Sequence, residues 1–205
     1  MATKTDPVLS KPAESTQRTI KPMTIEEFVV FAGERPDDER WELIEGVAVM
    51  SPAPTAVHQI IAGNIYMALG IIKLRTNAAW TPLMGIGTRV PVSPHSLPEP
   101  DVMVTEQSPA WTSVWDDALV LFEVLSESNT RTDQAWRRTV YASVPNCRHY
   151  VTVSSRKRVE VVRYDRAGGW QPVRIRDLQS VLDLPALGVS IPLLDLYRWT
   201  PLTAQ

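Results

Sequence analysis

Two acidic side chains stand beside runs of aliphatic residues, in PEPDVMV (98–104) and in LVLFEVLSES (119–128). A carboxylate at the edge of a buried strand is costly to keep ionised unless it is paired with a cation or bound to a metal ion. If the two segments are neighbouring strands, Asp101 and Glu123 can hold one hard cation such as Mg²⁺ or Mn²⁺. Such an ion polarises a phosphodiester and lowers the pKa of a bound water. The pair therefore indicates metal-dependent phosphodiester chemistry.

Each acid also has an ordinary structural explanation. Asp101 follows Pro100, and an aspartate at such a strand start is often a turn residue. Glu123 is the only polar side chain between Ala118 and Leu125, and a glutamate near the end of a strand is often a salt-bridge partner. Either acid alone is weak evidence of a site, because perturbed acids are also found in structural roles. The hypothesis depends on the pair.

The elements that must position these acids follow from periodicity and turn residues. Apolar residues at helical spacing predict helices, the first opened by a capping box of Thr24 and Glu27, and a hairpin is expected to turn at Glu45–Gly46. The segments around Asp101 and Glu123 have the composition of central strands buried on both faces. The order of elements predicts an α/β fold with a central sheet and helices on both sides. The expected helices are 24–33, 55–75 and 132–144. The expected strands are 41–44, 47–50, a broken strand in 78–92, 100–105, 118–126, 148–154, 158–165 and 168–175, with a short strand and a helical turn in 184–197.

Composition places these elements in one domain. The chain has 205 residues, of which 44% are hydrophobic, and a net charge of −2, so nucleic-acid binding would need a local basic patch. Residues 1–22 are polar and proline-rich and are expected to form a disordered tail before a single domain at 23–205. No run of 18 apolar residues is present, so no membrane span is expected. With a single cysteine, Cys147, these features predict a cytoplasmic protein.

Four segments, taken together, resemble the Uma2 family of restriction-endonuclease-like proteins, which belongs to the PD-(D/E)XK nuclease superfamily. They are WELIEGVAVMSPAPTAVHQIIAGNI (41–65), PEPDVMV (98–104), LFEVLSES (121–128) and TDQAWRRTVYASVPNCRHYVTV (132–153). The resemblance extends from about residue 23 to residue 196. It implies a restriction-endonuclease-like core, which is a mixed central β-sheet flanked by helices, and a Mg²⁺-dependent site that cuts DNA.

The resemblance also implies which residues form the site. Asp101 matches the acid of the PD motif and Glu123 the acid of the second motif, so both would ligate the metal. Glu42 matches a glutamate of the family's hairpin, and His58 a histidine that opens its long helix. From the residues alone, Glu42 can equally be a solvent-facing acid of an amphipathic strand, and His58 a capping or surface residue. A metal-bound water would attack the phosphodiester and leave a 5′-phosphate.

One position departs from the superfamily pattern. A lysine usually stands two residues after the second acid, but Leu125 occupies that place. In similar sequences the lysine has moved to the following helix, and the matching residue here is Arg137, with Arg138 as the alternative. An arginine can contact the scissile phosphate, but it is a poor general base because it does not lose its proton readily. The substitution predicts weakened or abolished turnover.

Three functions follow from these observations. The first is a metal-dependent endonuclease acting on DNA, expected to be a homodimer because cutting both strands needs two sites. The second is a catalytically weak or inactive nuclease-fold protein that binds nucleic acid, using the excess of nine Arg and Lys over three Asp and Glu in residues 131–166. The third is an interaction protein that uses an exposed surface of its seven tryptophans.

Overall fold

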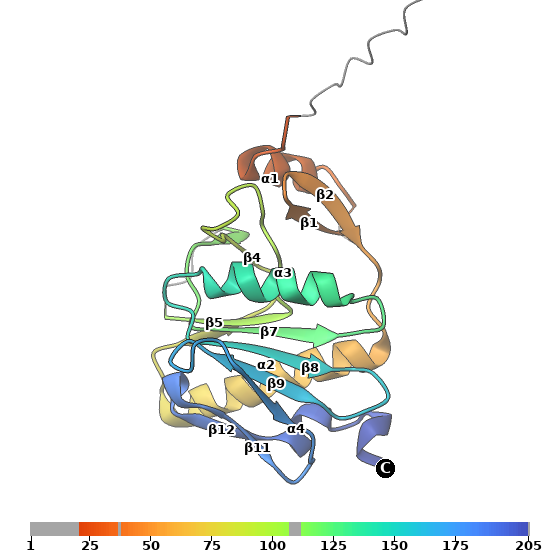
Figure 1. Cartoon of the computed structure of the whole chain (residues 1–205). Helices are drawn as coiled ribbons and strands as arrows, with labels where there is room; N and C mark the ends of the chain where they lie inside the picture. The colour runs from red at the N-terminus through yellow and green to blue at the C-terminus, as the bar shows by residue number, and fades with distance from the viewer. Residues whose placement is uncertain (1–20, 37, 107–111, 205) are drawn as a thin grey trace, which may run out of the picture.

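The computed structural model describes residues 21–36, 38–106 and 112–204, so the tail predicted at the N-terminus lies almost wholly outside the described residues. A six-stranded sheet runs through the centre of the molecule in the order β10-β9-β8-β7-β5-β3 (Figure 1). Strands β7 and β8 are parallel, and every other neighbouring pair is antiparallel, so the predicted mixed sheet is confirmed. The bounds of its strands are β3 Thr81–Leu83, β5 Val102–Thr105, β7 Val120–Leu125, β8 His149–Ser154, β9 Val161–Asp165 and β10 Pro172–Ile175.

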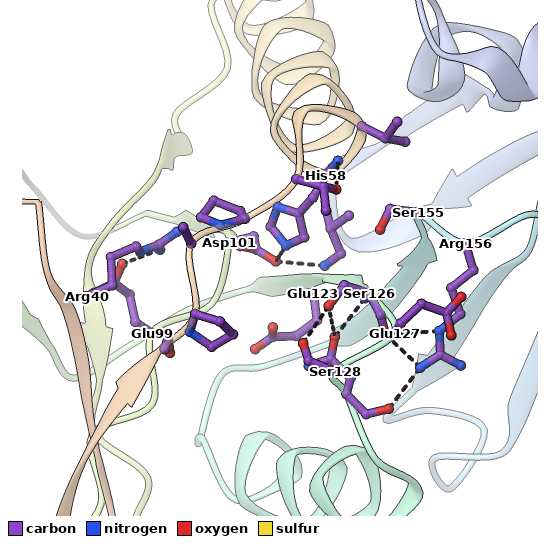
Figure 2. A pocket seen from close by; sticks show the side chains of 18 of the residues that line it. Arg40, His58, Glu99, Asp101, Glu123, Ser126, Glu127, Ser128, Ser155 and Arg156 are labelled. Carbon is purple, nitrogen blue, oxygen red and sulfur yellow. Dashed lines mark hydrogen bonds and ion pairs between the residues drawn. The ribbon is translucent and has the colours of Figure 1, made fainter.

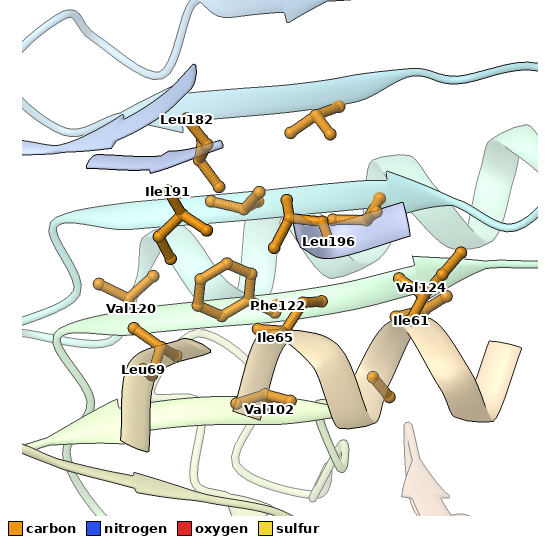
Figure 3. Packing of buried hydrophobic residues seen from close by; sticks show 14 of the residues in the cluster. Ile61, Ile65, Leu69, Val102, Val120, Phe122, Val124, Leu182, Ile191 and Leu196 are labelled. Atoms are coloured by element: carbon orange, nitrogen blue, oxygen red, sulfur yellow. The ribbon is translucent and has the colours of Figure 1, made fainter. Parts of the chain in front are cut away.

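Helices cover both faces of this sheet. The long helix α2 (Ala56–Thr76) packs on one face, where its buried side chains meet alternate residues of β7 such as Phe122 (Figure 3). Helix α3 (Arg131–Ala142) packs on the other face, against the intervening residues such as Leu121. Because successive side chains of a strand point to opposite faces, the two hydrophobic clusters lie on opposite sides of β7. The predicted arrangement, a central sheet with helices on both sides, is therefore confirmed.

Helix α2 is long and apolar enough to cross a membrane by length and composition alone. In the structure Ile61, Ile65 and Leu69 of this helix are fully buried against the central sheet. The helix therefore supplies one side of the hydrophobic core. A core helix and a membrane-spanning helix both need an apolar composition.

A separate hairpin stands at one end of the molecule, packed against α1 (Ile25–Gly33) (Figure 1). Its strands are β1 (Arg40–Ile44) and β2 (Val47–Ser51), and the predicted turn at Glu45–Gly46 is confirmed. Gly46 has a φ of 81°, and a Cβ there would lie 2.4 Å from that of Pro22, so glycine is required at this position. The hairpin thereby holds its inward side chains, including Glu42, over the central sheet.

Smaller elements complete the fold. Strands β4 (Gly87–Thr88) and β6 (Val114–Trp115) form a short parallel pair. Residues 184–197 were expected to hold a short strand and a helical turn, and they form β12 (Val189–Pro192) and α4 (Leu193–Tyr197). A strand that was not predicted, β11 (Val181–Leu184), pairs with β12, and Gly188 in a left-handed conformation reverses the chain between them. A 3₁₀ turn, Pro185–Leu187, lies between β11 and β12; helix α4 and a second 3₁₀ turn, Pro201–Ala204, follow β12.

The six tryptophans that the structure describes do not gather on one exposed surface. Of the six that the structure describes, Trp199 is exposed, and the other five are buried or half-buried. Trp111 lies outside the described residues. The interaction surface predicted from tryptophan content therefore has no support in the described part of the chain.

Candidate active site

A pocket of about 750 Å³ opens where the hairpin, the start of α2 and the end of β7 meet (Figure 2). All of the residues predicted for the site line it, although they come from five separate segments of the chain. They are Glu42, His58, Asp101, Glu123 and Arg137.

Asp101 lies directly before β5, at the position that extends its pairing with β7 one step beyond Val102 and Phe122. The next residue pair in this register is Asp101 and Glu123, so the two acids stand at opposite positions of neighbouring strands. One carboxylate oxygen of Asp101, Oδ2, accepts the backbone N–H of Val124 at 2.8 Å. The same oxygen lies 3.3 Å from Nε2 of His58. These contacts fix the orientation of Asp101 at the rim of the sheet.

His58 reaches Asp101 from the first turn of α2. Thr55 caps this helix by accepting the backbone N–H of His58 at 3.3 Å. The imidazole is buried rather than exposed on the helix surface. Its second nitrogen, Nδ1, is buried and has no hydrogen-bond partner in the described part of the chain. His58 therefore lies in the pocket beside Asp101, and its role there remains a prediction.

Glu123 lies deeper, on the α3 face of the sheet. Oε1 of Glu123 accepts the hydroxyl of Tyr141 at 2.7 Å and Nη1 of Arg137 at 2.9 Å. Burial of the carboxylate raises the pKa of Glu123 to about 8; Arg137 opposes this rise, while the negative charges of Asp101 and Glu42 add to it. The sequence indicated that Glu123 is costly to keep ionised, and its raised pKa in the structure agrees.

Arg137 joins the acids of the hairpin, the sheet and its own helix. Its Nη1 and Nη2 bind the two oxygens of Glu42 at 3.1 and 2.6 Å, in a bidentate pair. Its Nε binds Asp133, one helical turn earlier, at 3.2 Å. Glu42 also accepts the backbone N–H of Glu99 at 2.7 Å, so the alternative of a solvent-facing Glu42 is wrong. The guanidinium is therefore occupied largely by carboxylates.

The remaining oxygens decide whether a metal ion fits. Among the described residues, Oδ1 of Asp101 and Oε2 of Glu123 have no hydrogen-bond donor, so each acid keeps one oxygen for a cation. No group of three or more His, Cys, Asp and Glu in this part of the chain is arranged to hold a metal. A zinc site is therefore a poor fit. Mg²⁺ commonly uses one or two carboxylates and completes its shell with water and phosphate oxygens, so the two free oxygens are donors of the type that it uses.

Residues 25–194 match the sequence model of the family described as "Uma2: Putative restriction endonuclease". The chain belongs to the Uma2 family. Among solved structures, it is similar to a protein from Anabaena variabilis ATCC 29413, titled "a putative nuclease belonging to DUF820". The TM-score is 0.68 at 14% identity, over 87% of this chain and 99% of that chain, which shows a shared fold. No curated protein matches the sequence.

Two residues of this Uma2 site were missed from the sequence. Tyr141 and Asp133 each stand four residues from Arg137 on α3, and both contact it. The i, i+4 spacing brings side chains together on one helical face, so the spacing was the available signal. The ring of Tyr141 packs in the hydrophobic cluster on this face of the sheet, while its hydroxyl donates to Glu123.

Proposed function

We propose that this Uma2 protein is a metal-dependent endonuclease that hydrolyses phosphodiester bonds of DNA with Mg²⁺ or Mn²⁺. The observation that carries the proposal is the placement of Asp101 and Glu123 at opposite positions of β5 and β7, inside one pocket. Each retains one oxygen without a donor among the described residues. Membership of a family described as restriction endonucleases supports the same reaction class.

The chain's own residues would position the reacting groups. Asp101 and Glu123 would hold the ion, which when bound polarises a phosphodiester and lowers the pKa of a water molecule. The N–H of Val124 and the imidazole of His58 orient Asp101. Arg137 orients Glu123 and ties it to Glu42.

Arg137 would not act as the general base. A guanidinium stays protonated in proteins, so it cannot accept a proton from the attacking water. Its contacts with Glu42, Glu123 and Asp133 leave it acting mainly as the cation that holds the acids together. We therefore propose that it orients acids and retains only a secondary role at the scissile phosphate.

A plasmid assay tests the proposal. Supercoiled DNA incubated with the protein and Mg²⁺ or Mn²⁺ should be nicked or linearised, and the product should carry a 5′-phosphate. Asp101→Ala and Glu123→Gln should each abolish cleavage. Glu26→Gln, which changes an exposed acid of α1 that pairs with Arg89, is the control and should cut like the wild type. Equal cleavage by the wild type and Asp101→Ala would reject this mechanism.

The second candidate is a nuclease-fold protein that binds nucleic acid with little or no turnover. Leu125 stands where the superfamily lysine would be, and Arg137 is engaged by three carboxylates. This function predicts binding that weakens as salt rises, with no cleavage under any divalent ion. Cleavage that begins only in Arg137→Lys would support it over an active wild type.

A homodimer is part of the endonuclease proposal, because one such site cuts one strand. Light scattering of the purified protein tests it, and a monomer mass would restrict the proposed activity to nicking.

A further inference from the structure

The basic residues expected to meet phosphates are not spread evenly around the site. Of the nine Arg and Lys between residues 131 and 166, those that line the pocket are Arg137, Arg156 and Lys157. Arg137 is neutralised by acids, whereas Arg156 and Lys157 form no ion pair with a described carboxylate. The pocket therefore has an acidic end at the predicted metal ligands and, at the turn between β8 and β9, an end where Arg156 and Lys157 outnumber the one acid, Glu127 (Figure 2).

Arg156 is held in place by the backbone. Its Nε and Nη2 donate to the carbonyl of Ser126 at 3.0 and 2.7 Å, and Nη2 also donates to that of Asn129 at 2.8 Å. Carbonyl oxygens carry no net charge, so these bonds orient the guanidinium without cancelling its charge. Its Nη1 has no partner in the described residues. A fixed, half-buried arginine with a free nitrogen is suited to a phosphate oxygen.

The neighbouring loop adds polar groups to this end of the pocket. The hydroxyls of Ser126 and Ser128 lie 2.8 Å apart, and the Ser126 hydroxyl also bonds Oδ1 of Asn129 at 3.2 Å. Lys157 follows Arg156 directly and is exposed, and it forms no hydrogen bond or ion pair with a described residue. Its ammonium is therefore available to a ligand.

The distance from the acids suits a nucleotide chain. Ser126, which Arg156 contacts, is three residues after Glu123, a span of at most about 10 Å in extended chain. Beyond this end lies a second hollow of about 530 Å³, which shares Glu127, Arg156 and Lys157 with the pocket. A chain that crosses the acids can therefore continue over the turn into the second hollow.

We propose that Arg156 and Lys157 bind the phosphate next to the scissile one, so that the substrate is an internal segment of a DNA strand rather than a free nucleotide. The proposal rests on the endonuclease function above. It assigns to Arg156 and Lys157 the direct contact with a negatively charged phosphate, which carboxylates cannot make. A strand reaching this subsite presents at least one backbone phosphate beyond the bond that is cut.

Binding measured without cleavage tests the subsite. A labelled single-stranded oligodeoxynucleotide is titrated with the protein in chelator, and the affinity is followed by anisotropy as salt is raised. Lys157→Ala should bind more weakly, and the slope of log affinity against log salt should be shallower by about 0.7, the value for one lost phosphate contact on a single strand. Arg148→Ala is the matched control, because Arg148 is exposed at the opposite end of β8 and does not line the pocket.

The outcomes separate the subsite from the nuclease activity. Equal slopes for the wild type and Lys157→Ala, an equal loss in Arg148→Ala, or no binding by the wild type would each overturn the subsite. Plasmid cleavage with an unchanged Lys157→Ala slope would leave the nuclease standing without this subsite. A slope that depends on Lys157 in a protein that never cuts DNA would support the subsite and reject the nuclease.

Discussion

The carboxylate of Asp101 accepts the backbone N–H of Val124 across the junction of β5 and β7, at 2.8 Å. This bond ties the first acid to the residue that follows the second, Glu123. Glu123 lies within β7, and this bond holds Asp101, directly before β5, against the central sheet. A site built on strands keeps its geometry better than one built on loops, which suits a centre that must hold two like charges near one another.

Tyr141 should stabilise the fold through the bond from its hydroxyl to Glu123. Tyr141→Phe removes a donor to a buried carboxylate, and we expect the free energy of unfolding to fall by about 1–2 kcal/mol. Tyr150→Phe is the matched control, because the hydroxyl of Tyr150 is buried without a hydrogen-bond partner among the described residues. Urea unfolding of both variants measures the difference. A loss in Tyr150→Phe as large as that in Tyr141→Phe would contradict this assignment.

Among the site residues, substitution of Arg137 should lower the free energy of unfolding most. Arg137→Met leaves the buried carboxylate of Glu42 without its cation, and breaking a buried pair in this way costs about 3–5 kcal/mol. Arg148→Met, at an exposed arginine, should change stability by no more than about 0.5 kcal/mol. Urea unfolding near neutral pH measures both.

A double variant can distinguish two causes of the instability expected in Arg137→Met: a buried charge left without its partner, and lost packing of the arginine side chain. Adding Glu42→Gln to Arg137→Met should restore part of the stability, because one uncompensated charge is gone. If the double variant is as unstable as the sum of the two single variants, the acids and the arginine do not act as one cluster.

Much of this arrangement could be predicted because its signals are local. Periodicity indicated α2 and α3, and a lone polar residue in an apolar strand marked Glu123. The bidentate pair of Arg137 and Glu42 joins residues 95 positions apart, and such a contact depends on the packing of the hairpin over α3. No local pattern contains that information, so Arg137 was expected at a phosphate when the structure places it among acids.

The raised pKa of Glu123 should make stability depend on pH. In the metal-free protein its pKa is about 8, mainly through burial, against 4.5 in an unfolded chain. Between these values the folded state keeps a proton that the unfolded state has lost, so raising the pH lowers the free energy of unfolding. The slope should not exceed about 1.4 kcal/mol per pH unit, and it should vanish above the folded pKa.

Glu123→Gln removes this titration and supplies the comparison. The variant should lose less stability than the wild type between pH values of about 4.5 and 8, as measured by urea unfolding in chelator. The same pH profile for both proteins would mean that Glu123 is ionised throughout that range.

Divalent cations should stabilise the protein through the two acids that keep free oxygens. At a Mg²⁺ concentration about 100 times the dissociation constant, binding to the folded state alone adds about 2.7 kcal/mol. A thermal melt at constant ionic strength should therefore shift upward with Mg²⁺ in the wild type and in Glu26→Gln, but not in Asp101→Asn or Glu123→Gln. A shift that persists in Asp101→Asn would place the ion elsewhere, and the endonuclease proposal would lose its metal ligands even if the plasmid were cut.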